Sequence, residues 1–147
     1  MHRIFGNKLD VEYYTRPGAY IIPEENGKIA VVNTPKGYFL LGGGYENKET
    51  DEECIKRECF EEIGYSVLVG EKMCSAEAYV FHPKVKYFHP VQTYYTGRLI
   101  SKDMQPIEKD HILTWVTYGE IKGKMFSEMQ NWAIDIYFEK YNNILNK

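Results

Sequence analysis

The 147-residue sequence predicts an α/β fold of the α+β type, in which helices pack against a mixed β-sheet. Short apolar runs separated by turn residues predict strands through much of the chain. One strongly capped helix lies near the middle, and an amphipathic stretch closes the sequence. Because these elements do not alternate in a regular βαβ order, we expect a mixed sheet rather than a purely parallel one.

The N-terminal half predicts a hairpin and then a further short strand. Turn residues separate the apolar runs, which follow in this order: strand 19–23, turn 24–27, strand 28–32, turn 34–37 and a short run at 38–41. The three glycines Gly42, Gly43 and Gly44 come next, and we expect them to lead into a polar loop.

The best-defined helix begins after Thr50 and ends before Gly64. Thr50 and Glu53 form a capping box, since the hydroxyl and the carboxylate can satisfy free amides at the helix start. Gly64 suits the C-terminal stop. An apolar residue recurs at every fourth position in between, which provides one face for packing: Ile55, Cys59 and Ile63.

The C-terminal half predicts further strands and a long helix. The strands are expected at 65–69, 73–81, 91–100 and 111–116, and the helix from about 127 to 146. Trp115 is interpreted as a core anchor. One face of the helix is apolar and is expected to cover the core: Met129, Trp132, Ala133, Ile136, Tyr137 and Ile144.

Composition restricts the class of protein. The length fits one domain, 1–147, and the formal net charge of −3 argues against a protein that coats long nucleic acid. Cys54, Cys59 and Cys74 form no CxxC pair, so we expect free, packed thiols in a reducing cytoplasm. No stretch approaches the length of a membrane span, and the first residues lack the apolar run of a secretory signal.

Three glutamates on the central helix indicate where the chemistry lies. Glu58, Glu61 and Glu62 stand at i, i+3 and i+4, so their side chains share one face and repel one another. A divalent cation would relieve this repulsion, and carboxylate oxygens suit Mg²⁺ or Mn²⁺. Hydrolysis of a phosphoanhydride needs such a cation, since it neutralises the anhydride charge and activates a water. Arg57 is expected to project away from the centre of this cluster.

The segment 43–65 resembles the Nudix box, G-x5-E-x7-R-E-U-x-E-E-x-G-U, where U is aliphatic. Cys59 and Tyr65 replace the two aliphatic residues, and we interpret them as altered packing. The glycines lack the proline that often precedes them in the family. Every invariant position of the box is filled at its proper spacing: Gly43, Glu49, Arg57, Glu58, Glu61, Glu62 and Gly64.

This resemblance implies a Nudix fold, a mixed sheet sandwiched between helices, and a Mg²⁺-dependent hydrolase of a nucleoside diphosphate linked to another group. By resemblance, Glu58 and Glu62 are the principal metal ligands, with Glu61 as a further ligand or base. The Gly42 carbonyl is a main-chain ligand. Arg57 and Glu49 pair to hold the loop against the helix.

Residues outside the box are weaker candidates. His82, Lys84 and Lys86 are candidates for substrate binding, and their alternation would place them on one side of an extended strand. Glu46 matches an acidic residue common in the family after the glycine pair, and it joins them as a candidate. A distal acid could serve as base or metal ligand, and three residues are candidates: Glu108, Asp110 and Glu120.

Other functions stay open at this point. The three glutamates could form a solvated face, and a Nudix-fold domain could bind nucleotide without turnover. A third alternative is a Nudix-fold isomerase acting on an isoprenoid diphosphate. The expected partner is a small nucleotide, such as a dNTP, ADP-ribose or a nucleotide sugar, with no membrane and no long nucleic acid. A homodimer is an expectation by analogy.

Overall fold

The computed structural model describes residues 1–141. It contains helices α1 (Asp51–Ile63), α2 (Tyr118–Ile121) and α3 (Glu128–Ile136), and a π-helical turn, η1 (Tyr137–Tyr141). The strands are β1 (His2–Phe5), β2 (Tyr14–Glu25), β3 (Lys28–Thr34), β4 (Gly37–Phe39), β5 (Leu41–Gly44), β6 (Tyr65–Ala78), β7 (Val80–His82), β8 (Lys86–Lys102) and β9 (Ile112–Val116).

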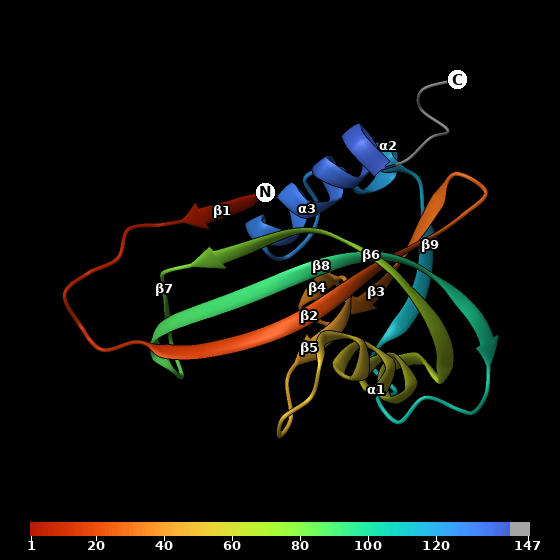
Figure 1. The fold of residues 1–147 in the computed structure, drawn as a ribbon, viewed down its shortest axis with the longest axis horizontal. Coiled ribbons are helices and arrows are strands. Elements are labelled where there is room, and N and C mark those ends of the chain that lie inside the picture. The colour runs from red at the N-terminus through yellow and green to blue at the C-terminus, as the bar shows by residue number, and fades with distance from the viewer. Residues whose placement is uncertain (142–147) are drawn as a thin grey trace.

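The sheet is mixed, as the sequence predicts. Its main path runs β1-β6-β8-β2-β3-β4, while β5 pairs with β2, β7 with β8 and β9 with β3. Two pairs, β1 with β6 and β2 with β8, are parallel, and the other strand pairs are antiparallel. Figure 1 shows α1 below the central strands and α3 above them.

Both faces of the sheet are buried, each beneath a different helix. Along β3, Ile29 and Val31 belong to the core under α3, whereas Ala30 and Val32 belong to the core under α1. This alternation follows from the two-residue period of a strand. The face toward α1 packs against the apolar stripe that the sequence predicts on that helix, together with Cys54. The sandwich of a mixed sheet between helices is therefore confirmed.

Several strands differ from their predicted limits. β2 begins at Tyr14 rather than at residue 19, and β8 covers Lys86–Lys102 rather than 91–100. β6 joins two predicted strands, because shifts in register near Val69 and Lys72 let it continue along β8. β1 was not predicted, since its exposed residues carry no apolar alternation and only parallel pairing with β6 makes it a strand.

The glycines lead into a polar loop, as predicted, but Gly42–Gly44 are themselves strand residues rather than a turn. They form the end of β5, are buried, and pair with residues 18–20 of β2. The space explains why glycine is needed: a Cβ at Gly42 would lie 2.7 Å from the Cα of Tyr20. The close approach of β5 to β2 is a tertiary feature, invisible to local turn propensity.

The predicted helix 127–146 is confirmed only over its first part. Ser127 precedes α3, and η1 follows it directly, so the helical hydrogen bonding changes after Ile136. On the predicted core face, Met129, Ala133, Ile136 and Tyr137 are buried, and Trp132 packs edge-on to Phe5. Residues 142–146, including Ile144, lie outside the described residues.

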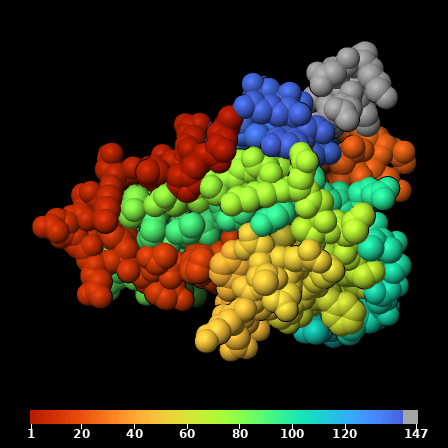
Figure 2. All heavy atoms as spheres, in the orientation of Figure 1, coloured from red at the N-terminus to blue at the C-terminus, as the bar shows by residue number. Residues whose placement is uncertain are grey.

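The molecule is longest along the sheet. In Figure 2 the N-terminal segment forms the left-hand end, and the loop after β5 lies on the lower side with α1. Within residues 1–141, no helix combines the length and the apolar character needed to cross a membrane.

Candidate active site

The start and the end of α1 fix where its side chains project. The predicted capping box is present, with the Thr50 hydroxyl accepting from the Glu53 N–H and the Glu53 carboxylate accepting from the Thr50 N–H. Gly64 ends the helix in the left-handed conformation at φ 72°. Four buried residues, Cys54, Ile55, Cys59 and Ile63, dock the helix on the sheet. The acidic face is therefore held in one orientation.

The three glutamates of this face are buried to different extents. The Glu61 side chain is 36% exposed, Glu58 is 17% exposed and Glu62 only 7%. Glu62 accepts a hydrogen bond from the Gly42 N–H at 3.1 Å and faces Nδ1 of His111 at 3.0 Å. A solvated surface would leave all three exposed, so the alternative of a solvated face is excluded.

Burial makes the acidic face unfavourable for bare carboxylates. Desolvation, and then the neighbouring Glu62 carboxylate, raises the pKa of Glu58 to about 7. The pKa of Glu62 is also raised by burial, although hydrogen bonds from His111 and Gly42 oppose the shift. Negative charge at this face would be stabilised by a cation.

Gly43 lies directly against the Glu58 carboxylate. A Cβ at position 43 would overlap Oε2 of Glu58, so only a glycine here leaves room for the Glu58 carboxylate. The thiol of Cys54, on α1, donates to the Gly43 carbonyl at 3.3 Å. The backbone of β5 and the acids of α1 thus form one cluster, as the glycine and glutamate spacing of the box predicts.

Arg57 connects the loop after β5 to the acidic face. Its guanidinium donates to both oxygens of Glu49, at 2.5 and 2.9 Å, and to the Gly44 carbonyl at 3.0 Å. The predicted Arg57–Glu49 pair is present, and it lowers the pKa of Glu49. Glu46, whose carboxylate lies 3.6 Å from Arg57, is exposed on the same loop.

The expectation that Arg57 projects away from the carboxylates is wrong. Its Nη1 lies 3.2 Å from Glu58 and 3.3 Å from Glu61. The planar guanidinium has donors on several edges, so it binds Glu49 with one edge and approaches the acids with another. Arg57 therefore positions both the loop and the acidic face.

For the hydrolytic activity that the resemblance implies, Arg57→Lys is expected to lower kcat by roughly tenfold, in the range seen when a residue that orients metal ligands is changed. Lysine keeps the charge but cannot hold both Glu49 oxygens and the Gly44 carbonyl in one plane. Steady-state kinetics on a nucleotide that the wild-type protein hydrolyses is the measurement. Lys56→Arg, on the exposed side of the same helix, is the control, and equal loss in both variants would contradict this role.

The loop after β8 brings one predicted distal acid to the cluster. The Ile107 and Glu108 amides donate to the Glu61 carbonyl at 2.9 and 3.3 Å, so the loop docks on the end of α1. The Glu108 carboxylate then lies 3.2 Å from Nδ1 of His111. Glu62, Glu108 and His111 form a group of possible metal ligands. His111 was missed, because no local spacing relates it to Glu62.

The other two distal candidates have different positions. Asp110 lines a hollow of about 400 Å³ beside Glu62 and His111. Glu120 does not reach the cluster, and instead forms a capping box with Thr117 at the start of α2. Its sequence position gave no way to distinguish a capping acid from a distal ligand.

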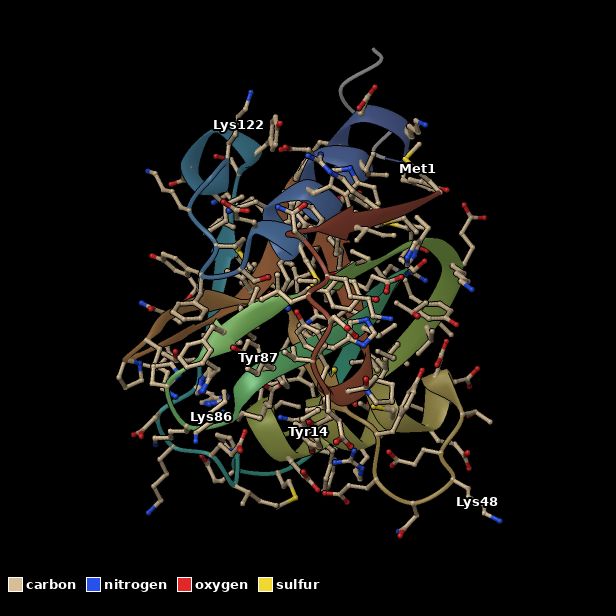
Figure 3. The ribbon with its side chains drawn as sticks, turned by 90° about the vertical axis from the view of Figure 1, so that its left-hand side faces the viewer. Met1, Tyr14, Lys48, Lys86, Tyr87 and Lys122 are labelled. Carbon is tan, nitrogen blue, oxygen red and sulfur yellow. The ribbon has the colours of Figure 1, made fainter. Side chains whose placement is uncertain are left out.

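His82, Lys84 and Lys86 do not share one side of an extended strand. Residues 83–85 form the turn of the β7–β8 hairpin, and Nδ1 of His82 accepts from the Lys84 N–H at 3.1 Å. Pro83 and the left-handed Lys86, at φ 68°, fit a reversal of the chain. Figure 3 shows Lys86 and Tyr87 at the hairpin end, on the other side of the view from Lys48. Of the three candidates, His82 lines a cavity on the α3 side of the sheet.

The three cysteines are buried and free, as predicted. Burial raises the pKa of Cys54 and Cys74 to about 11 and that of Cys59 further. Each is a protonated packing residue at neutral pH, which argues against a thiolate nucleophile.

Comparison with known families decides the assignment. The NUDIX domain model matches residues 15–137. The chain belongs to the Nudix family. As a member it is a hydrolase of phosphoanhydride bonds, and the segment 43–65 that resembles the box lies inside the matched range. A search of curated proteins finds no match.

Solved Nudix structures share the fold at low sequence identity. A NUDIX hydrolase from Nitrosomonas europaea is 18% identical with a TM-score of 0.71, covering 86% of this chain and 90% of its own. The MutT protein from Methanosarcina mazei Go1 is 18% identical with a TM-score of 0.69, and the match covers 90% of this chain and 100% of the MutT chain. An ADP-ribose pyrophosphatase from Streptococcus suis is 14% identical with a TM-score of 0.61, and the match covers 86% of this chain and 93% of the pyrophosphatase.

The raised pKa of Glu58 predicts how the metal-free Nudix protein responds to pH. The folded protein holds this proton more tightly than the unfolded chain, so stability falls as pH rises from about 4.5 to about 7. Glu58→Gln removes the ionisation and should be more stable than wild type at pH 8, by about 1–3 kcal/mol at 1.4 kcal/mol per pKa unit. At pH 4.5 the difference should vanish.

Urea denaturation in EDTA at both pH values measures this effect. Glu52→Gln, at an exposed position of the same helix, is the control and should show no such dependence. A Glu58→Gln variant that is less stable than wild type at pH 8 would contradict the unfavourable burial of this charge.

Proposed function

We propose that the chain is a Mg²⁺-dependent hydrolase of a nucleoside diphosphate linked to a further group, acting at the face of Glu58, Glu61 and Glu62. One observation carries the proposal. The three acids differ in burial, from the partly exposed Glu61 to the buried Glu62, and they lie against the backbone of β5 beside an open hollow. An anionic substrate can approach these acids only when a cation neutralises them.

The residues present fit such a cation. Glu58 and Glu62 are the principal ligands in this proposal, Glu61 is a further ligand or base, and the Gly42 carbonyl is the main-chain ligand. The room that Gly43 leaves for the Glu58 carboxylate supports this assignment, as does the all-oxygen donor set. Mg²⁺ or Mn²⁺, when bound, neutralises anhydride oxygens and lowers the pKa of a coordinated water.

The side chains around this face have separate roles. Glu61 is the candidate on the acidic face that accepts the proton of the attacking water. Arg57 and Glu49 hold the loop so that the acids keep their spacing. His111 bonds to Glu62 and orients its carboxylate. Hydrolysis then releases two phosphate-bearing products.

The substrate is a small nucleotide in this proposal. The hollow beside Glu62 and His111 also contains Lys36 at its edge, which suits a phosphate or another anionic group of the ligand. The proteins with a similar fold include an ADP-ribose pyrophosphatase and a UDP-X diphosphatase, which supports a diphosphate with a variable second group.

Chromatographic separation of each nucleotide from its products tests the proposal, because it needs no metal-dependent coupling enzyme. The panel contains dNTPs, ADP-ribose, nucleotide sugars and dinucleoside polyphosphates, each with Mg²⁺ and with EDTA. We expect turnover of at least one compound only with the divalent cation. Turnover in EDTA would exclude the metal-dependent mechanism, and nucleotide binding without turnover would favour the binding-module alternative.

A further inference from the structure

A second cavity adjoins the hollow beside Glu62. It measures about 380 Å³ and shares Tyr20 and Phe39 with that hollow. Its wall is mostly apolar and aromatic, and comes from six strands and the start of α3. The larger apolar residues are Phe5, Tyr20, Phe39, Val80, Phe88 and Met129. The volume is near the lower limit for small-ligand sites, so one aromatic ring system with its sugar fits better than two.

Two glutamines interrupt this apolar wall. Gln130 of α3 is almost fully buried, and Gln92 of β8 is half-buried. The backbone N–H of Leu40 donates to Oε1 of Gln130 at 2.8 Å, and Nε2 of Gln130 donates to Oε1 of Gln92 at 3.2 Å. The hydroxyl of the buried Tyr94 donates to the same Gln92 oxygen at 2.7 Å.

This chain of hydrogen bonds fixes which end of Gln92 is free. A backbone N–H can only donate, so the Gln130 atom that it meets must be the oxygen, and its other atom must be the amide nitrogen. Because the amide nitrogen of Gln130 donates, the Gln92 atom that it contacts must be the oxygen. Both N–H groups of the Gln92 amide therefore remain free to donate, and among the described residues they have no hydrogen-bond partner.

The free donor belongs to a residue of the cavity wall. Gln92 lines the cavity, and no fully buried side-chain nitrogen or oxygen within residues 1–141 lacks a partner. The unpartnered nitrogen of Gln92 is thus accessible. An aromatic-walled cavity with one oriented donor is suited to a planar heterocycle that presents an acceptor.

We propose that this cavity holds the base of the substrate and that Gln92 Nε2 donates to an exocyclic carbonyl oxygen of that base. The proposal rests on the proposed function, because it places the base next to the site of hydrolysis, with Tyr20 and Phe39 lining both spaces. In a base with an amino group at the same position, the amino N–H would face the N–H of Gln92, and neither donor would find an acceptor. The site therefore selects oxo bases over amino bases of the same size.

Equilibrium binding of matched nucleoside monophosphates tests this selection. Inosine and adenosine 5′-monophosphates differ in the oxygen or amino group at C6, and uridine and cytidine 5′-monophosphates differ likewise at C4. The measurement is titration calorimetry in Mg²⁺, because the cation offsets the acidic face and a monophosphate has no phosphoanhydride bond to hydrolyse. In at least one pair the oxo member should bind more tightly, by roughly 5- to 100-fold for one unsatisfied hydrogen bond.

Gln92→Glu is the decisive variant. It is nearly isosteric and keeps the acceptor for Gln130 and Tyr94, but it replaces the free donor by an acceptor. The oxo-to-amino affinity ratio should fall to one or below, and a ratio unchanged from wild type would overturn the proposal. Gln92→Leu should bring the ratio near one. Gln105→Glu, exposed and lining neither cavity, should leave the ratio unchanged.

The results separate this inference from the proposed function. Turnover with no effect of Gln92 on the ratio overturns the inference alone. Selective binding without turnover of any panel compound overturns the hydrolytic function and leaves the base site in place. Failure of all four monophosphates to bind at millimolar concentration overturns the base site.

Discussion

Glu58→Gln and Glu62→Gln should each lower kcat by about a hundredfold or more while the fold persists. Each variant removes one anionic oxygen from the face that has to hold the cation, and a cation in such a site contributes several kcal/mol to transition-state stabilisation. In Glu62→Gln, the amide oxygen of the new side chain can still accept the hydrogen bond from the Gly42 N–H, so the contact between α1 and β5 survives.

The measurement is steady-state turnover together with Mn²⁺ binding by each variant. Circular dichroism and urea denaturation verify the fold. Glu52→Gln, which only alters an exposed ion pair with Lys56, should retain wild-type turnover. Near-wild-type turnover in both Glu58→Gln and Glu62→Gln would refute the assignment of the acidic face.

Gly42→Ala should destabilise the protein by about 3 kcal/mol or more, a large effect for a single residue. Gly42 has φ +138°, which disfavours any side chain, and its Cβ would collide with the backbone of β2 at Ala19 and Tyr20. The strand cannot move away easily, because β5 is held between β2 and α1. The free energy of unfolding from urea titration measures the loss.

Two other glycines separate the causes of this loss. Gly123→Ala meets no atom within 4 Å but lies at φ +71°, so it should cost about 1 kcal/mol from backbone conformation alone. Gly119→Ala meets no atom and has no positive φ, and in α2 it should be neutral or slightly stabilising. Equal losses at Gly42 and Gly123 would show that the collision with β2 contributes nothing.

Local features of the sequence determined the helix at the site. The capping box at Thr50, the stop at Gly64 and the four-residue apolar period all depend on neighbouring residues, so they could be predicted and are present. The Arg57–Glu49 pair was predictable for a different reason. Its spacing belongs to a family motif, and the structure contains the pair.

Contacts between distant segments were decided only by the tertiary structure. His111 lies beside Glu62 across 49 residues, and Gln92 meets Gln130 across 38. Neither pair leaves a local signal, since each depends on which strands become neighbours. The same holds for Gly42–Gly44, whose turn propensity is overridden by pairing with β2.

The sequence by itself thus determined the family, the fold class and the acidic helix, because each is written in local periodicity or in a contiguous motif. The tertiary structure decided how deeply each acid is buried, which distal acid approaches, and what lines the adjoining cavity. These properties depend on chain segments that come together only when the sheet forms. Burial in turn sets the pKa of Glu58, and with it the unfavourable charge that a cation would relieve.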